Sequence, residues 1–295
     1  MSKIKTVAIV GGTHGNEFSG IYLLRKWQQP TAVVRDSFSV ETVFANPKAH
    51  DDNKRYVDHD LNRQFSLTDL ANNDLASYEQ SRAKVINQQI GPKGDARVDF
   101  IIDLHNTTSN MGPCLILLQS DSFNRQMGAY VKMQMPDAVV VFEDHTPVEQ
   151  NHFLSSIAPQ GVIVEVGPQP QSVIRQDILD WMDEMATHIL DFVHLHNTGE
   201  LLSLIPSYEA FRYHETLSLP VDEQGQRIGM VHRLVQDNDF KPLSNGDPIF
   251  TLFDGTEVNW QGDYEAYPHF INEAAYYDNN LAMSLAKKIV METHG

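Results

Sequence analysis

The chain has 295 residues, of which 41% are hydrophobic, 22 are basic and 39 are acidic, so its formal net charge is -17. This length and this hydrophobic content suffice for one large domain or two unequal ones, each with a buried core. The negative charge argues against binding to nucleic acid or to an anionic membrane surface, and it means that an anionic substrate must meet locally placed arginines.

Short apolar strands and helices alternate through the first 200 residues. The chain opens with a β-branched strand at residues 6–10, a glycine-rich turn and a helix that ends before Pro30. Further strands are expected at residues 38–47, 98–104, 114–119, 138–144 and 161–167, with helices at 77–90 and 171–197. Apolar strands that alternate with helices predict a largely parallel sheet covered by helices.

The pattern of predicted elements changes near residue 200, after the longest predicted helix. Beyond this point, short β-rich stretches are separated by turns of Gly, Pro and Asp. We therefore divide the chain into an α/β domain of residues 1–199 and a smaller β-rich domain of residues 200–295.

The first candidate site is the turn after the opening strand, VGGTHGNE, which ends at Glu17. A phosphate-binding turn needs GxGxxG or GxxxxGK[ST], and this turn has neither the third glycine nor the lysine. His14 and Glu17 are three residues apart, so a helical first turn would put an imidazole and a carboxylate on one face, as a metal site requires. The alternative is a polar helix entrance capped by Thr13 or Asn16.

The second candidate is His105, which follows the strand at residues 98–104. The carboxyl ends of strands are where open α/β sheets form their sites. Asp103, two residues earlier, could hold the imidazole in one tautomer. His14, Glu17 and His105 would then supply three ligands and leave a fourth position for water, as in catalytic zinc sites. In the alternative interpretation, His105 only bonds within its own loop.

The third candidate is the loop segment RYVDHDLNRQF, which contains Arg55, Asn62 and Arg63. A guanidinium presents a planar fork that a carboxylate accepts through two bonds, and an adjacent amide adds a donor. The segment could therefore bind a substrate carboxylate. The alternative is a solvated loop whose arginines pair with Asp58 or Asp60.

The fourth candidate is Glu165, which lies within the apolar strand at residues 161–167. A carboxylate there is costly unless it points outward at an edge or serves a site. Close to a water bound by a metal, it could act as a general base and then pass the proton to a leaving nitrogen.

Taken in order, these motifs resemble the aspartoacylase family, which consists of zinc-dependent N-acyl-amino-acid amidohydrolases related to zinc carboxypeptidases. The resemblance rests on GGTHGNE, YVDHDLNRQF, DLHNTTSNMG, EVGPQPQ and FINEAAYY, which are spread between residues 7 and 277. It implies a carboxypeptidase-like α/β fold, with a mixed, mostly parallel sheet that carries helices on both faces. It also implies a smaller β-rich C-terminal domain that covers the active site.

The resemblance implies a role for each candidate residue. One zinc ion per subunit would be bound by three of them, His14, Glu17 and His105. Glu165 would activate the water and contact the substrate, and Arg55 would bind the substrate by polarising its scissile carbonyl. Asn62 and Arg63 would hold the α-carboxylate, and Tyr276 of the second domain would close over the substrate.

The identity of the acyl amino acid depends on one position. Family members that prefer N-acetylaspartate carry an arginine ten residues before the catalytic glutamate, where this chain has Ser155. Lys132, His145 and His152 are candidates to replace that arginine. We rank N-acetyl-L-aspartate first, with acetate and L-aspartate as products. The alternatives are N-acetylated aromatic or neutral amino acids or mercapturates, then a peptide carboxypeptidase, and last a non-catalytic binder.

The expected partner is a small-molecule N-acyl amino acid, with neither nucleic acid nor a membrane. No stretch approaches the ~18 uninterrupted apolar residues of a membrane span. One cysteine, Cys114, cannot form an internal disulfide, and the first apolar run is too short for a secretory signal. We therefore expect a cytoplasmic enzyme. The oligomeric state, with a homo-oligomer among the options, and the replacement of zinc by another divalent metal are left open.

Overall fold

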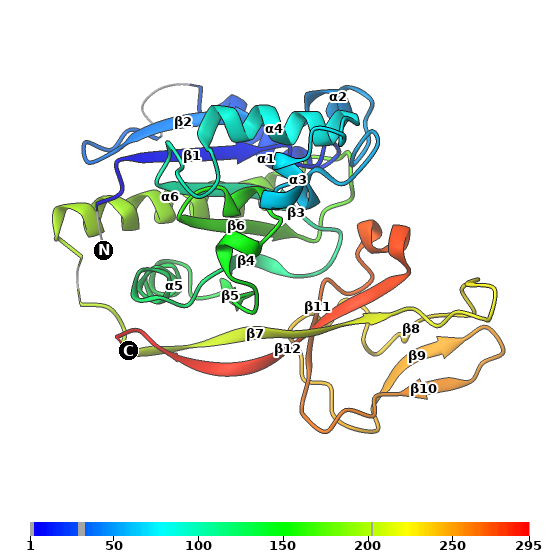
Figure 1. Cartoon of the computed structure of the whole chain (residues 1–295). Coiled ribbons are helices and arrows are strands. Elements are labelled where there is room, and N and C mark those ends of the chain that lie inside the picture. Colours follow the sequence, from blue (N-terminus) through cyan, green and yellow to red (C-terminus); the bar gives the residue numbers. More distant parts are fainter. Residues whose placement is uncertain (1–2, 29–32, 202, 295) are drawn as a thin grey trace.

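The structure is a computed structural model that describes residues 3–28, 33–201 and 203–294. These residues form a nine-stranded sheet with the order β11-β12-β7-β5-β4-β6-β3-β1-β2 (Figure 1). Its strands are β1 (Thr6–Gly11), β2 (Ser39–Phe44), β3 (Phe100–Asn106), β4 (Gly112–Leu117), β5 (Val139–Phe142), β6 (Gln160–Gly167), β7 (Ser207–Ser218), β11 (Tyr267–His269) and β12 (Leu281–Glu292).

The sheet is mixed and mostly parallel, as predicted. Strands β2, β1, β3 and β6 run parallel to one another, and β4 and β5 form a second parallel group with β7. The two groups meet where β4 pairs with β6 in antiparallel orientation. The carboxyl ends of β1, β3 and β6 therefore lie at one edge, where the candidate residues of the first, second and fourth motifs can meet.

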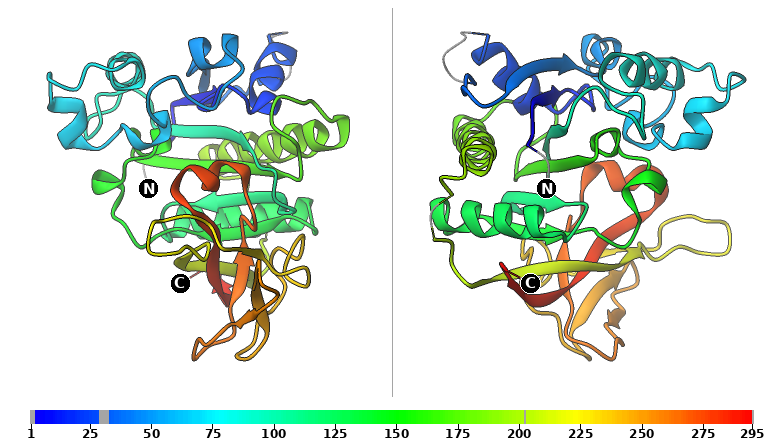
Figure 2. Two further views of the ribbon diagram at one scale, coloured as in Figure 1. Left: turned by 90° about the vertical axis from the view of Figure 1, so that its right-hand side faces the viewer. Right: turned by 60° about the vertical axis from the view of Figure 1, so that its left-hand side comes forward.

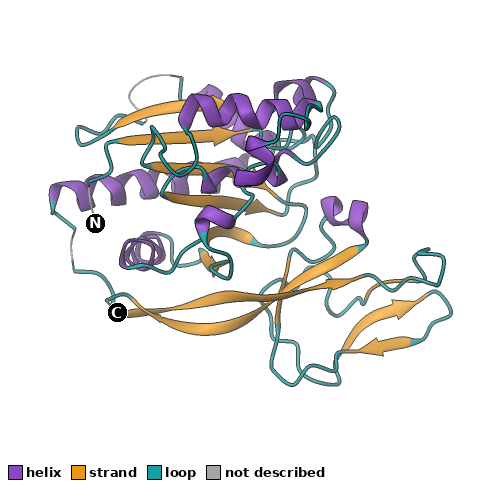
Figure 3. Ribbon diagram, in the orientation of Figure 1, coloured by secondary structure: helices purple, strands orange, loops and turns teal. Residues whose placement is uncertain are grey.

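Helices cover both faces of the sheet (Figures 2 and 3). They are α1 (Phe18–Lys26), α2 (Pro47–Asp51), α3 (Leu67–Ala71), α4 (Tyr78–Ile90), α5 (Ser122–Gln134) and α6 (Gln176–Thr198). Residues alternate along β1, so Val7 and Ile9 join the core formed with α1, α5 and α6, while Ala8 and Val10 join the core formed with α4. Helices on both faces of the sheet are confirmed.

The helix boundaries differ in detail from those predicted. The first helix, α1, ends at Lys26, and Pro30 lies outside the described residues. Helix α6 begins at Gln176, five residues later than predicted, and is followed by Gly199 with a φ of 74°, a conformation that glycine adopts without strain. Helix α5 was not predicted. None of the helices in the described ranges is both long and apolar enough to cross a membrane.

The last third of the chain is rich in strands. The 12-residue strands β7 and β12 pair along their length and extend beyond the rest of the sheet (Figure 1). A separate antiparallel sheet is formed by β8 (Gly229–Val231), β9 (Pro248–Leu252) and β10 (Glu257–Asn259). A smaller β-rich C-terminal part is therefore confirmed. The large sheet crosses residue 200 through the β5–β7 pair, and the division at that residue stays a prediction.

Candidate active site

The turn between β1 and α1 folds tightly because glycine occupies two of its positions. Gly12 has a φ of 73°, and a Cβ on Gly15 would lie 2.2 Å from the backbone of Ala49. The Gly15 backbone N–H donates a hydrogen bond to the carbonyl oxygen of Arg55 at 3.0 Å. The turn thereby brings the loop that carries Arg55 against the start of α1.

The polar residues of this turn do not cap the helix. Thr13 donates its hydroxyl hydrogen to Asp103 at 2.7 Å, and the Asn16 amide donates to Gln171 at 2.9 Å. Glu17 occupies the N-cap position, and its carboxylate makes no capping bond. The alternative interpretation of the turn as a capped helix entrance is therefore wrong, and the Glu17 carboxylate is available for other contacts.

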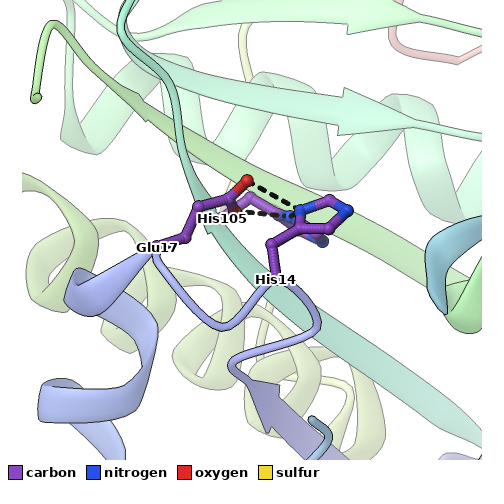
Figure 4. Close-up of side chains that lie close together, drawn as sticks. All are labelled: His14, Glu17 and His105. Atoms are coloured by element: carbon purple, nitrogen blue, oxygen red, sulfur yellow. Dashed lines mark hydrogen bonds and ion pairs between the residues drawn. The ribbon is translucent and has the colours of Figure 1, made fainter. Parts of the chain in front are cut away.

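His14, Glu17 and His105 point toward one another from two strand ends (Figure 4). The His14 Nδ1 atom lies 2.7 Å from Glu17 Oε1, and His105 Nδ1 lies 2.9 Å from Glu17 Oε2. The two Nδ1 atoms are 3.2 Å apart. All three side chains are buried.

The remaining ring nitrogen of each histidine faces a carboxylate. His14 Nε2 lies 2.9 Å from Asp60 Oδ1, and His105 Nε2 lies 2.9 Å from Asp103 Oδ2. A carboxylate on Nε2 favours the tautomer that leaves Nδ1 free to bind a metal. Bonds of about 2.0–2.1 Å in a tetrahedral site put two nitrogen ligands roughly 3.3 Å apart, so the two Nδ1 atoms fit a zinc ion.

The charges of this cluster support one another. Burial alone would raise the pKa of Glu17, but His14 and His105 outweigh it and hold this pKa below its ordinary range. Burial alone would lower the pKa of His105, but Asp103 and Glu17 raise it well above its ordinary value. A cation at the centre can replace the protons shared by these groups.

Arg55 lies beside the cluster with its guanidinium fixed by two carboxylates. Its Nη1 atom donates to Glu17 Oε1 at 2.8 Å, and its Nη2 atom donates to Asp60 Oδ2 at 3.2 Å. Burial lowers the pKa of Arg55, but Asp60 and Glu17 outweigh it, so the group is always charged. The alternative of pairing with Asp60 is thus correct, and it holds Arg55 at the cavity wall rather than in solvent.

Glu165 lies on central strand β6, opposite His105 of β3, and is buried. The outward-facing edge position considered for it is therefore wrong. Burial raises the pKa of Glu165 well above its ordinary range, and the nearby Glu17 adds to the rise while His105 opposes it. A carboxyl with a raised pKa beside His105 suits a proton-transfer role.

Asn62 and Arg63 form a short 3-10 helix, η1 (Leu61–Arg63), at the rim of the cavity. The Asn62 Oδ1 atom accepts the backbone N–H of Leu154 at 2.8 Å, which leaves its amide hydrogens for other partners. Arg63 stacks over the ring of Phe153 at 4.9 Å and pairs with no carboxylate of a described residue. Both side chains can therefore donate to a carboxylate in the cavity.

The C-terminal part completes the cavity. Tyr276 lies in η4 (Ala274–Asn279), and its hydroxyl lies 3.0 Å from the Ser284 hydroxyl. Next to it, Glu273 accepts hydrogen bonds from Thr107 and from the Thr108 backbone, so η4 is fastened to the loop after β3. The resulting cavity has a volume of about 240 Å³. The eight candidate residues, His14, Glu17, Arg55, Asn62, Arg63, His105, Glu165 and Tyr276, all line it.

Ser155 does not reach this cavity. It is fully buried in η3 (Leu154–Ser156), and its backbone packs against Gly161 of β6. Of the three basic residues considered as replacements for an arginine there, only His145 lines the cavity. Lys132 donates instead to the backbone carbonyls of Pro136 and Ala138, which follow α5.

Three residues at the site were missed by the sequence analysis or were given another role. Asp60 was considered only as a partner of arginine, although it also fixes His14. Glu143 and Glu273 line the cavity; Glu273 lies within the motif FINEAAYY but was given no role there, and Glu143 lies in none of the motifs. The position of Glu143 directly after an apolar strand is the same signal that pointed to His105, and it could have been used.

Two family models match the chain. The model described as "Succinylglutamate desuccinylase/Aspartoacylase catalytic domain" matches residues 3–193. The model described as "AstE/AspA barrel-sandwich hybrid domain" matches residues 206–288. Together they account for most of the chain, including the motifs that form the cavity.

Individual relatives divide between two names. A "Probable aspartoacylase" of Trichodesmium erythraeum is 40% identical over 98% of this chain and 98% of its own length. An "N-acyl-aromatic-L-amino acid amidohydrolase (carboxylate-forming)" of Homo sapiens is 42% identical over 97% of this chain and 91% of its own. The crystal structure of murine aminoacylase 3 matches with a TM-score of 0.91 at 40% identity, covering 100% of this chain and 98% of that one.

Proposed function

The chain belongs to the succinylglutamate desuccinylase/aspartoacylase family and is an amidohydrolase of N-acyl amino acids, and from this premise we propose that it acts on those with a neutral side chain, aromatic ones first. The products are a carboxylate and the free amino acid. This substrate choice differs from the N-acetyl-L-aspartate that the resemblance ranked first, and it rests on the charges that line the cavity.

One observation carries the proposal. Among the described residues that line the cavity, Arg55 and Arg63 are the only arginines or lysines. Arg55 is already paired with Glu17 and Asp60, so Arg63 remains for a substrate carboxylate. An N-acyl amino acid has one α-carboxylate, which Arg63 and Asn62 can hold, whereas N-acetylaspartate needs a second cation for its side chain.

The buried His-Glu-His cluster is typical of a zinc site in this family, and we infer that His14, Glu17 and His105 hold one zinc ion per subunit. A bound zinc ion supplies Lewis acidity, which lowers the pKa of water and polarises a carbonyl group. Asp60 and Asp103 keep the two imidazoles oriented for this role.

The protein groups around the cluster provide the proton transfer and the charge stabilisation. In the proposed mechanism, Glu165 accepts the proton of the attacking water and donates it to the leaving amide nitrogen. The Arg55 guanidinium faces the carbonyl oxygen as negative charge develops there. Asn62 and Arg63 fix the α-carboxylate, so the amide is presented in one orientation. Tyr276 and its neighbours in η4 limit the space above the substrate.

N-acetyl-L-aspartate is the second candidate substrate. His145 lines the cavity and would offer a cation when protonated, and relatives of the same identity are named as aspartoacylases. The aromatic alternative has the apolar lining in its favour, since Ile116, Phe153, Ile163, Phe270 and Leu281 all border the cavity.

The test is the ratio of kcat/KM for N-acetylphenylalanine to that for N-acetylaspartate, with the zinc content measured on the same sample. We expect a ratio above about ten, because one unpaired buried charge costs at least this factor. A ratio below one would overturn the proposal in favour of aspartate. The absence of hydrolysis of either compound by zinc-loaded protein would contradict the assignment as an acyl-amino-acid hydrolase.

A further inference from the structure

One face of the sheet forms the floor of the cavity, and the carboxyl groups of Glu165 and Glu143 lie on this face. Glu165 of β6 pairs with Cys114 of β4, and Ile163 pairs with Ile116. Side chains two residues apart share a face, so Glu165, Ile163 and Ile116 form one surface. On the other side of β4, Ile116 pairs with Val141 of β5, and Glu143 follows two residues later on that same face.

The register therefore orders these residues across the cavity. Glu165 lies at one end, next to His105 of β3. The isoleucine pair lies in the middle, and Glu143 lies at the far end, two strands away from Glu165. Glu165, Ile163, Ile116 and Glu143 all line the cavity. A substrate that is held at Glu165 and extends across the cavity therefore passes over the two isoleucines and then reaches Glu143.

The Glu143 carboxyl has no fixed partner. Within the described ranges, its side chain takes part in none of the ion pairs or hydrogen bonds, and only its backbone N–H is bonded, to Leu117. Burial raises the pKa of Glu143 to about 7, with Arg63 as the opposing charge. The negative charge of Glu143 in turn contributes to raising the pKa values of Tyr276 in η4 and of Cys114 in β4. Glu143 is half-buried and lines the cavity, so its unpaired carboxyl can meet a group of the substrate.

We propose that Glu143 selects the side chain of the substrate, excluding anionic side chains and admitting neutral ones. The inference rests on the proposed function. The amide group and the α-carboxylate are attached to the same carbon atom, and Glu165 and Arg63 hold these two groups. The side chain then extends over Ile116 and Ile163 and ends at Glu143.

The surrounding charges leave an anionic side chain without a counter-ion. Arg63 is taken by the α-carboxylate, and Arg55 is paired with Glu17 and Asp60. The His145 ring packs against Tyr213, with ring centroids 4.7 Å apart and planes inclined by 30°. A carboxylate at the far end would meet Glu143 instead, and like charges in a buried setting are strongly unfavourable.

N-acetylasparagine and N-acetylaspartate test this proposal, because they have the same shape and differ in charge. The kcat/KM of each is measured at pH 8 for the zinc-loaded wild type and for Glu143→Gln. We expect the wild type to prefer the asparagine compound by at least about tenfold, and the variant to reduce that preference about tenfold through a gain on the aspartate compound. Glu223→Gln, which removes an exposed carboxylate outside the cavity, should keep the wild-type preference.

An unchanged preference in Glu143→Gln, or an equal loss on both compounds, would overturn the inference while leaving the proposed function intact. If the wild type cleaves neither compound nor N-acetylphenylalanine, the proposed function itself fails. Kinetics with N-acetylphenylalanine and zinc content show whether the variant is folded. Glu143→Ala provides the same comparison should the glutamine variant not fold.

Discussion

Arg55 is the residue whose surroundings make the sharpest kinetic prediction. Its guanidinium is held by Glu17 and Asp60 at the cavity wall, so it needs no rearrangement to meet a developing oxyanion. Arg55→Ala should lower kcat/KM roughly a hundredfold or more, since one oxyanion donor is worth about 3 kcal/mol. Zinc content, measured on the same sample, separates this loss from metal loss. Arg97→Ala, which breaks an exposed pair with Glu41, is the control, and near-normal turnover in Arg55→Ala would remove the residue from this role.

A substitution at Glu165 can distinguish a role in proton transfer from a role in metal binding. It is not one of the three clustered ligands, although it lies opposite His105. Glu165→Gln keeps the size of the side chain and removes its ability to accept a proton, so zinc content should stay at the wild-type level while kcat falls at least about a hundredfold. Metal analysis and steady-state kinetics check both parts. Loss of zinc from this variant would instead show that Glu165 supports the metal site.

The site residues differ in how far the sequence reveals them. Asp103 was expected to hold the His105 tautomer because it is an acidic residue two positions earlier, and the structure has this contact, since residues two apart on a strand share a face. Asp60 orients His14 across 46 residues, and only the folding of an irregular loop brings the two together. Periodicity carries no information on such a loop. Family motifs identify the residues in it, but their contacts require the three-dimensional structure.

At the scale of elements, Lys93 joins two irregular segments that shape the cavity rim. It is 8% exposed, and its ammonium group donates to the carbonyl oxygens of Phe65 and Asn151 and to the Ser156 hydroxyl. Burial lowers the pKa of Lys93 to about 8, with Glu149 as the opposing charge. These bonds hold the segment after η1 against η3, and η1 carries Asn62 and Arg63.

Lys93→Met should therefore affect both stability and substrate binding. The buried Phe65 carbonyl loses its lysine donor, while the Asn151 carbonyl keeps only the Ser156 hydroxyl at 3.3 Å, and a group left unpaired costs about 1–3 kcal/mol. The freed rim should raise KM for an N-acyl amino acid more than it lowers kcat, because the catalytic cluster lies on other elements. Urea unfolding and steady-state kinetics measure the two effects. Lys5→Met, at an exposed position directly before β1, should change neither. An equal fall in kcat in Lys93→Met would contradict a rim-specific role.

The regular elements were predictable where packing follows the local pattern. The strands buried on both faces were recognised from apolar runs, and α4 from its helical spacing. Helix α5 was missed although Phe123, Met127 and Tyr130 follow that spacing and it is as long as α4, because it lies between two stronger strand signals. The antiparallel orientation of β4 depends on the long-range pairing with β6, which no local pattern encodes.

At the scale of the whole molecule, the sheet connects the two parts of the chain. Strand β7 continues the sheet next to β5, and β12 and β11 extend it, so the cavity walls from both parts share one framework. The change in sequence pattern near residue 200 reflects the turn-rich segments around β8 to β10. It does not indicate that the large sheet continues past this residue. Strand order is a property of the complete fold, since it depends on contacts between residues far apart in the sequence.

His269 links this framework to the pH dependence of stability. It lies on β11, is fully buried and stacks on Phe240 with ring centroids 5.5 Å apart. Neither ring nitrogen has a well-aligned hydrogen-bond partner among the described residues. Burial lowers the pKa of His269 to about 4, against an opposing effect of the Tyr267 backbone. The folded protein therefore holds this imidazole neutral at a pH where an unfolded chain protonates it.

The sign of the effect follows from proton uptake. Below a pH of about 6.5, which is the pKa of His269 in the unfolded chain, the unfolded chain binds a proton. The folded protein binds that proton only near pH 4, so stability falls as the pH falls through this window. The loss attributable to this group reaches about 2 kcal/mol at pH 5. The His269→Leu variant lacks this pH-dependent loss. The drop in the free energy of unfolding between pH 7.5 and pH 5, measured in urea, should therefore be about 2 kcal/mol smaller in the variant than in the wild type. His294→Leu, at an exposed position, should behave as the wild type. An equally steep decrease in His269→Leu would show that the acid sensitivity arises from other groups.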